Sequence, residues 1–183
     1  MKSRVHSSIA AALLCTLVAV AAPALAKSTA PEPGGEWEHC LIVGVTDGDT
    51  MKARCGISGA FRQVTIRLAE IDAPESSQAY GQRSKAHLAG LCFLRPAQVS
   101  PQSTDRYGRT VARVQCSGRD ASLAMVSAGM AWRFVRYSRD PEIQRAEQQA
   151  RESRVGLWRD SSPIPPWEFR RSQKSSVAHG SEE

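Results

Sequence analysis

Carboxylates and arginines gather in three short segments between residues 47 and 109. The segments are Asp47-Gly48-Asp49-Thr50, then residues 67–75, and finally residues 105–109. Clustered carboxylates repel one another unless a hard cation such as calcium neutralises them. Arginines, in contrast, bind planar oxyanions through paired hydrogen bonds. The presence of clustered carboxylates and arginines in one chain predicts metal-assisted attack on a phosphate ester.

The acidic residues can be interpreted with or without a function. Asp-Gly is a common hairpin turn, an aspartate such as Asp72 often precedes a proline turn, and Glu75 alone suits a solvated loop or a helix cap. The functional interpretation rests on the expectation that Asp72 ends the third predicted strand and reaches the Asp47–Asp49 turn from another element. Glu75 would then act as a base, or orient a water, beside the metal.

The arginines are equally ambiguous when taken singly, because most arginines of a basic protein are solvated. Arg67 alternates with the apolar residues of its strand, so it can face a cleft instead of the core. Arg109 follows Tyr107-Gly108 in a polar loop between two strands, where catalytic groups are often mounted on a rigid scaffold. Tyr107 either stacks on a base or sugar or packs against the protein.

The N-terminus predicts export. Lys2 and Arg4 precede an apolar run over 9–20 that is short for a membrane span, and a small-x-small site ends at Ala26. We therefore expect a signal peptide over 1–26, with an uncleaved membrane anchor as the alternative. Its removal lowers the net charge from +6 to +4, a modest excess that favours a polyanionic partner. We expect an exported monomer, periplasmic or secreted, without stable membrane association after cleavage.

Four cysteines follow the signal peptide, and in an exported chain they predict two disulfides. Cys40 and Cys55 flank the Asp-Gly turn almost symmetrically, which favours pairing Cys40 with Cys55 and Cys92 with Cys116. A zinc site is the alternative, although the chain has no closely spaced cysteine pair of the zinc-binding type.

The hydrophobic pattern predicts one domain over 37–160. A flexible leader over 27–36 precedes it, and a proline-rich, then disordered tail over 161–183 follows. Strands are expected over 41–45, 50–55, 61–71, 97–100 and 110–116, and helices over 80–92, 120–128 and 140–156. Residues 163–167 are expected to run extended, with disorder from Ser172 onward. This order predicts an α+β fold, a five-stranded barrel of the OB type with three α-helices.

The three segments, in this order, resemble those of the staphylococcal nuclease (thermonuclease) family. The shared pattern is Asp-Gly-Asp-Thr, then Arg-Leu-x-x-x-Asp-x-Pro-Glu, then Asp-x-Tyr-Gly-Arg, and the resemblance extends to about Trp158. It implies a calcium-dependent nuclease that acts on DNA and RNA and leaves 3′-phosphate ends.

The resemblance also implies roles for individual residues. Asp49, Asp72 and the backbone carbonyl of Ala73 match the calcium ligands, and Asp47 and Thr50 match residues nearby that act through water. Glu75, Arg67 and Arg109 match the catalytic glutamate and the two phosphate-binding arginines, and Tyr107 and Tyr137 match nucleotide contacts. Val135 stands where the best-known member has a second tyrosine, and Ser76–Ala79 replace a longer, lysine-rich segment.

Two other classes of function remain possible from the sequence. One is an OB-type module that binds nucleic acid or a protein without catalysis, since a fold alone does not establish activity. The other is a secreted adhesion protein that docks through Trp167 and the proline-rich tail. Calcium-dependent hydrolysis separates the first from an enzyme, and removal of residues 160–183 tests the second.

Overall fold

The computed structural model describes residues 36–179, with side chains up to residue 175. The signal peptide expected over 1–26 lies outside the described residues, as do all but the last residue of the leader and residues 180–183. Within the described part of the chain, no helix is both long and apolar enough to cross a membrane.

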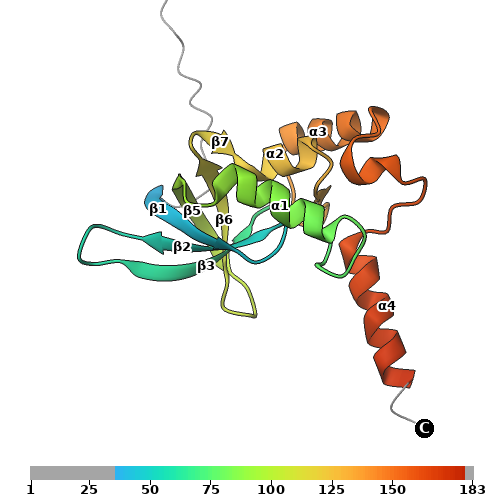
Figure 1. Ribbon diagram of the computed structural model, residues 1–183, viewed down its shortest axis with the longest axis horizontal. Coiled ribbons are helices and arrows are strands. Elements are labelled where there is room, and N and C mark those ends of the chain that lie inside the picture. The colour runs from blue at the N-terminus through green and yellow to red at the C-terminus, as the bar shows by residue number, and fades with distance from the viewer. Residues whose placement is uncertain (1–35, 180–183) are drawn as a thin grey trace, which may run out of the picture. The chain divides into compact units, whose positions relative to one another are not determined.

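A closed five-stranded barrel is the main sheet of the described chain (Figure 1). Its strands are β1 (Glu38–Val45), β2 (Thr50–Cys55), β3 (Arg62–Leu68), β5 (Pro96–Thr104) and β6 (Thr110–Cys116). They neighbour one another antiparallel in the order β3-β2-β1-β5-β6, and β6 then pairs in parallel with β3 to close the barrel. Closure leaves few free strand edges, as in OB-type barrels.

Three two-residue strands extend this framework: β4 (Ile71–Asp72), β7 (Arg119–Asp120) and β8 (Trp132–Arg133). β7 continues the sheet beyond β6, while β4 pairs with β8 in a separate antiparallel ribbon. The β4–β8 ribbon fixes Asp72 opposite Trp132, so an acidic residue of the candidate site is held by backbone pairing.

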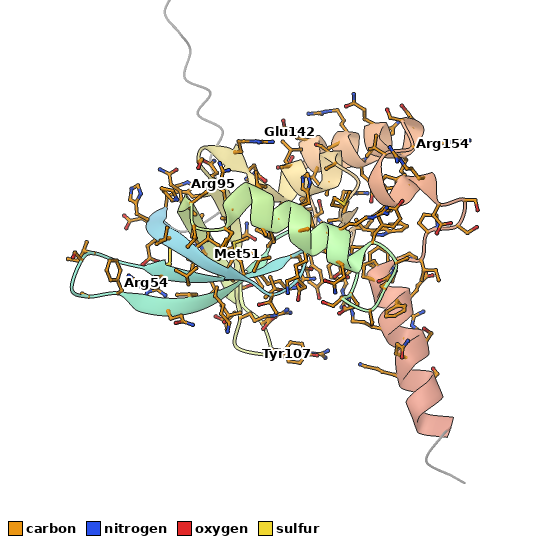
Figure 2. The ribbon with its side chains drawn as sticks, in the orientation of Figure 1. Met51, Arg54, Arg95, Tyr107, Glu142 and Arg154 are labelled. Atoms are coloured by element: carbon orange, nitrogen blue, oxygen red, sulfur yellow. A yellow bond between two sulfur atoms is a disulfide. The ribbon has the colours of Figure 1, made fainter. Side chains whose placement is uncertain are left out.

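Alternation along β2 shows why the barrel has a filled interior. Met51, Ala53 and Cys55 are buried, whereas Lys52 and Arg54 between them are exposed. Figure 2 labels Met51 and Arg54 on this strand. Because successive side chains of a strand point to opposite faces, the apolar set lines the barrel and the basic set faces solvent.

The described helices are α1 (Gly81–Cys92), α2 (Ala121–Ser127), α3 (Pro141–Glu152) and α4 (Pro166–His179), with a 3-10 turn η1 (Gly156–Arg159). α1 and α2 pack on the barrel and α3 packs on α2, whereas α4 extends away from the barrel (Figure 1). Asp120 and Asp140 cap α2 and α3 by accepting hydrogen bonds from backbone N–H groups of the first turn, at 2.9 and 2.7 Å. Such caps satisfy donors that a helix leaves unpaired at its start. Both aspartates stand at the first residue of a helix that the sequence predicts, over 120–128 and 140–156.

Both expected disulfides are present, Cys40–Cys55 and Cys92–Cys116. The first joins paired residues of β1 and β2, and the second ties the end of α1 to the end of β6. The cysteines are therefore used as cross-links within the barrel and its first helix.

The structure corrects three sequence predictions. The third strand does not run unbroken from Phe61 to Ile71, because Glu70 adopts a positive φ of 67° and separates β3 from β4. Residues 163–167 are not wholly extended, because α4 begins at Pro166, and residues 172–179 are helical where disorder was expected. The described chain therefore has four α-helices and not three. Proline is well suited to a first helical position, where its missing N–H has no partner to lose.

Candidate active site

A pocket of about 740 Å³ opens where the barrel strands meet the β4–β8 ribbon and α4. Pockets of this size commonly hold small ligands or parts of larger ones. It brings together almost every predicted site residue; its lining includes Asp47, Asp49, Arg67, Asp72, Ala73, Glu75, Tyr107, Arg109 and Tyr137. Thr50 does not line it, but Thr50 joins two of the lining residues by hydrogen bonds.

The turn between β1 and β2 carries the first two carboxylates. Oδ1 of Asp47 accepts a hydrogen bond from the backbone N–H of Asp49 at 3.2 Å, which tightens the turn. Gly48 lies against α1, where an added Cβ would be 1.9 Å from Oγ of Ser84. A side chain at position 48 would therefore push the turn away from α1 and displace both acids.

Arg67 bridges two aspartates that come from different elements. Its Nη2 lies 3.2 Å from Oδ2 of Asp49 and 2.9 Å from Oδ1 of Asp72, and its Nη1 donates to the carbonyl of Ile71 at 3.1 Å. Oδ2 of Asp49 also accepts from the backbone N–H of Ala73 at 3.2 Å. These contacts bring the turn and the β4 strand to one point, as expected from the sequence, and the carbonyl role of Ala73 stays a prediction.

Arg109 is oriented from two sides. Oδ2 of Asp105 accepts a hydrogen bond from Nε at 2.7 Å and lies 2.7 Å from Nη2, a two-point contact that fixes the plane of the guanidinium. Nη1 donates to Oγ1 of Thr50 at 3.2 Å, and Thr50 in turn donates to Oδ1 of Asp49 at 2.9 Å. Arg109 is thus linked to the carboxylates through one hydroxyl group.

Glu75 lies on the far side of Asp72, in the loop before α1. Its backbone N–H donates to the side chain of Gln78 at 3.2 Å. A Cβ added to Gly81 would be 1.9 Å from its carbonyl oxygen, so the glycine lets the loop sit tightly on the start of α1. The Glu75 side chain is 38% exposed, which leaves it accessible to water and to a ligand.

Burial and mutual repulsion raise the pKa of two acids in the pocket, Asp47 and Asp72. Burial raises the pKa of Asp47 to about 6, and the negative charge of Asp49 adds to the increase. Burial also raises the pKa of Asp72; hydrogen bonding from Arg170 opposes this change, and Asp49 reinforces it. A raised pKa means that the surroundings penalise the charged form, so these acids gain from a nearby cation.

This donor set fits a calcium ion. Calcium prefers several oxygen ligands, with carboxylates prominent among them, and Asp47, Asp49, Asp72 and Glu75 all line one pocket. Asp49 and Asp72 are the residues that would hold the ion, because a carboxylate oxygen of each lies within 3.2 Å of one point, the Nη2 atom of Arg67.

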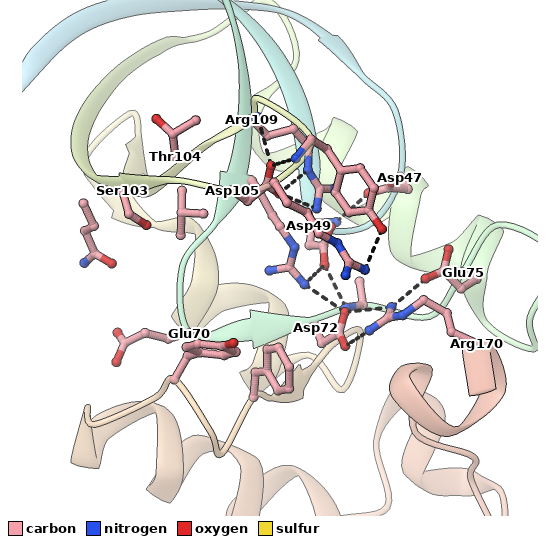
Figure 3. A pocket seen from close by; sticks show the side chains of 18 of the residues that line it. Asp47, Asp49, Glu70, Asp72, Glu75, Ser103, Thr104, Asp105, Arg109 and Arg170 are labelled. Carbon is pink, nitrogen blue, oxygen red and sulfur yellow. Dashed lines mark hydrogen bonds and ion pairs between the residues drawn. The ribbon is translucent and has the colours of Figure 1, made fainter.

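Arg170 is the site residue that the sequence analysis missed. Its Nη2 lies 2.6 Å from Oδ2 of Asp72, and its Nη1 lies 2.6 Å from Oε1 of Glu75 and 3.2 Å from Oδ1 of Asp72. Figure 3 shows it reaching from α4 toward both acids. An extended segment over 163–167 and disorder from Ser172, as the sequence predicts, give no reason to place a site residue between them. Pro166 followed by Glu168 is a helix-start signal that could have found it.

The two tyrosines line the pocket but are largely exposed, Tyr107 at 68% and Tyr137 at 60%. Tyr107 is at the tip of the loop between β5 and β6 (Figure 2), and its ring lies 4.8 Å from the guanidinium of Arg106. Tyr137 packs edge-on against Phe134, with 4.9 Å between ring centroids. Exposed rings at the rim suit stacking on a ligand, and their nucleotide-binding role stays a prediction.

Comparison with known proteins identifies the family. Residues 65–160 match the family model described as staphylococcal nuclease homologue. A Haemophilus influenzae protein named uncharacterized endonuclease is 40% identical over 143 residues, covering 78% of this chain and 79% of the relative. Protein ParB of Escherichia coli is 39% identical over 98% of this chain and 100% of its own length. Micrococcal nuclease of Shigella flexneri is 37% identical over 74% of this chain and 82% of its own. This chain belongs to the staphylococcal nuclease family.

Proposed function

We propose that the protein is a calcium-dependent nuclease that hydrolyses phosphodiester bonds of DNA and RNA and leaves 3′-phosphate ends. One observation carries the proposal: Arg67 joins Asp49 to Asp72 at the centre of a pocket that Glu75 and Arg109 also line. Carboxylates for a metal, a base and two oxyanion-binding arginines are the groups that metal-assisted phosphate hydrolysis needs. The nuclease names of two relatives support the same activity.

Glu75, Arg67 and Arg109 have different roles in the proposed reaction. Glu75 accepts a proton from a water molecule, whose oxygen forms a bond to phosphorus while the bond from phosphorus to the 5′-oxygen breaks. The leaving 5′-oxygen takes a proton from solvent. Arg67 and Arg109 donate hydrogen bonds to the non-bridging oxygens, where negative charge increases in the transition state. Calcium, when bound by Asp49 and Asp72, supplies positive charge that polarises the phosphate.

The proposal includes an exported enzyme that acts as a monomer, periplasmic or secreted, without stable membrane association. Two disulfides within the described chain support export, because such bonds persist in oxidising compartments. The net charge of +6 for the whole chain favours approach to the polyanionic substrate.

The experiment compares cleavage of denatured DNA and of RNA in calcium and in excess chelator. The key variant is Glu75→Gln. Its matched control is Glu70→Gln, which removes a charge from the same pocket but keeps an oxygen to accept the backbone N–H groups of Arg139 and Asp140. We expect calcium-dependent cleavage that falls by a factor of about 100 to 10,000 in Glu75→Gln and is kept in Glu70→Gln.

Analysis of the ends distinguishes the products, since only 3′-phosphate ends resist extension by a polymerase until a phosphatase removes them. A folded protein that binds nucleic acid in calcium without cutting it would contradict the proposal. That result would instead support a binding module without catalysis, the alternative left open by the sequence.

A further inference from the structure

The guanidinium of Arg170 occupies the space between two acids of the proposed catalytic site. It makes a two-point contact with Asp72, through Nη2 to Oδ2 at 2.6 Å and Nη1 to Oδ1 at 3.2 Å, and Nη1 also reaches Oε1 of Glu75 at 2.6 Å. One nitrogen atom is therefore shared by both carboxylates, as the dashed lines in Figure 3 show. Its position marks a point where a positive charge is favourable.

These contacts are incompatible with the proposed roles of the same acids. Both oxygens of Asp72 accept from Arg170, and Oδ1 also accepts from Arg67, so the guanidinium of Arg170 fills the space in front of this carboxylate where a calcium ion would bind. Glu75 cannot serve as a strong base while its oxygen accepts a short charge-assisted hydrogen bond. A guanidinium has hydrogen-bond donors but no acceptor, and it stays protonated in proteins. Arg170 can therefore take over neither the role of the calcium ion nor that of the base Glu75.

The start of α4 is anchored so that Arg170 reaches this position. The ring of Trp167 stacks on Phe134 at 5.7 Å between centroids and meets Trp132 edge-on at 5.7 Å. Before the helix, the side chain of Gln78 donates to the carbonyl of Ile164 at 2.6 Å. Because residues three apart lie on the same face of a helix, fixing Trp167 directs Arg170 toward the acids.

The contact is also easy to release. The Arg170 side chain is 39% exposed, and residues 171–175 that follow are all exposed. Figure 1 shows α4 running away from the barrel beyond its first turns. Among the described residues, withdrawal of the Arg170 side chain breaks only its contacts with Asp72 and Glu75.

We propose that α4 is an autoinhibitory element, in which Arg170 competes with calcium for Asp72 and keeps Glu75 paired until calcium displaces it. This inference rests on the proposed function, because it concerns the same acids. Two cations cannot occupy one set of oxygens, so the apparent calcium affinity of the protein is lowered by the fraction of molecules in which Arg170 is bound.

Calorimetric titration with calcium chloride tests the competition directly, without a measurement of activity. The variant is Arg170→Ala, and the matched control is Arg171→Ala, which removes an equal charge from an exposed neighbour on the same helix. We expect calcium to bind roughly tenfold more tightly to Arg170→Ala than to Arg171→Ala, as removal of a competing bound state requires. Equal affinities in the two variants would overturn the inference.

A second variant guards against misfolding, and a second measurement separates inhibition from substrate binding. Arg170→Gln keeps an unbranched polar side chain without the charge and replaces Arg170→Ala if the latter unfolds; the same tenfold tightening is expected. In the cleavage assay, the calcium concentration at half-maximal rate should fall by the same factor. A lower rate at saturating calcium with unchanged affinity would make Arg170 a substrate-binding residue and would also overturn autoinhibition.

The outcomes separate this inference from the proposed function. Wild-type protein that never cleaves in calcium contradicts the proposed function. Wild-type protein that cleaves in calcium, with equal calcium affinities in Arg170→Ala and Arg171→Ala, contradicts autoinhibition alone.

Discussion

Two arginines bind the same carboxylate of Asp72, but from very different parts of the molecule. Arg67 comes from β3 of the barrel, its side chain is only 14% exposed, and it also contacts Asp49 and the backbone carbonyl of Ile71. Arg170 comes from α4, is more exposed, and makes its described contacts only with Asp72 and Glu75. One arginine is part of the framework, and the other is mounted on an element that can move.

This difference explains why two arginines with the same charge are expected to have different roles. An arginine held by several partners on a rigid strand is preorganised, so its contribution to a transition state needs no rearrangement. An arginine on a terminal helix stabilises the acids only while that helix stays in place. The contrast gives each region a different expected response to mutation, to loss of cross-links and to acid.

Replacing Arg67 should have the largest effect. We expect Arg67→Ala to lower the rate at saturating calcium by a factor of about 100 to 1,000 or more, because a preorganised donor to the phosphate is lost. Arg62→Ala is the control, since Arg62 lies at the other end of the same strand and pairs with Glu38. Steady-state kinetics on a short DNA substrate measures both. An Arg67→Ala enzyme as active as Arg62→Ala would remove the distinction between the two arginines.

Loss of a disulfide should lower the stability of the barrel but not that of α4. We expect Cys92→Ser combined with Cys116→Ser to lower the free energy of unfolding of the barrel by about 3 kcal/mol, because a loop of 24 residues is no longer closed in the unfolded chain. The amides of α4, which open locally, should exchange at an unchanged rate. Hydrogen exchange followed residue by residue measures both. An equal loss of protection in α4 would show that α4 and the barrel unfold as one unit.

The barrel and its acids were predictable from sequence because local signals and tertiary structure agree there. The Asp-Gly turn, the alternation along β2 and the aspartate caps of α2 and α3 all specify the structure that forms. The break between β3 and β4 was not predictable, because it depends on Glu70. Its positive φ is stabilised by distant partners, the backbone N–H groups of Arg139 and Asp140 that bond to its side chain.

The C-terminal part of the site was missed for a different reason. The sequence after Pro166 is polar and has few apolar residues to pack, so composition alone favours disorder. Its helix is stabilised at one end by Trp167 on Phe134 and Trp132, contacts between segments far apart in the chain. The helix-start signal of Pro166 and Glu168 indicates the helix, but only the tertiary anchor places Arg170 at the acids.

Removal of the Trp167 ring, which anchors α4, should have a smaller effect than Arg67→Ala or loss of the Cys92–Cys116 disulfide. We expect Trp167→Ala to tighten calcium binding several-fold, because aromatic pairs contribute about 0.5–1.5 kcal/mol beyond their burial and their loss loosens α4. Phe93→Ala, which truncates an exposed aromatic residue elsewhere, is the control. Calorimetric titration measures the affinities. Unchanged affinity in Trp167→Ala would mean that Arg170 reaches the acids without help from the aromatic contacts.

Arg109 lies between the two extremes, because its guanidinium is oriented by the partly exposed carboxylate of Asp105 and by the hydroxyl group of Thr50. Burial acts to raise the pKa of Asp105, but hydrogen bonds from the side chain and backbone of Arg109 and from the backbone of Tyr107 outweigh it and hold the pKa below its ordinary value. Since the folded-state pKa is lower than that of the unfolded chain, near 3.9, the stabilising contribution is complete above about pH 4 and is lost as the pH falls through the folded value.

We therefore expect Asp105→Asn to reduce stability at neutral pH by less than about 1 kcal/mol, as is usual for an accessible ion pair. The difference from wild type should shrink as the pH falls below 4, because the wild-type carboxyl then becomes protonated and loses the same attraction. Urea unfolding of both proteins between pH 3 and 7 measures this difference. A difference that is absent at neutral pH, or that does not change between pH 3 and 7, would mean that Asp105 is not the carboxylate that orients Arg109.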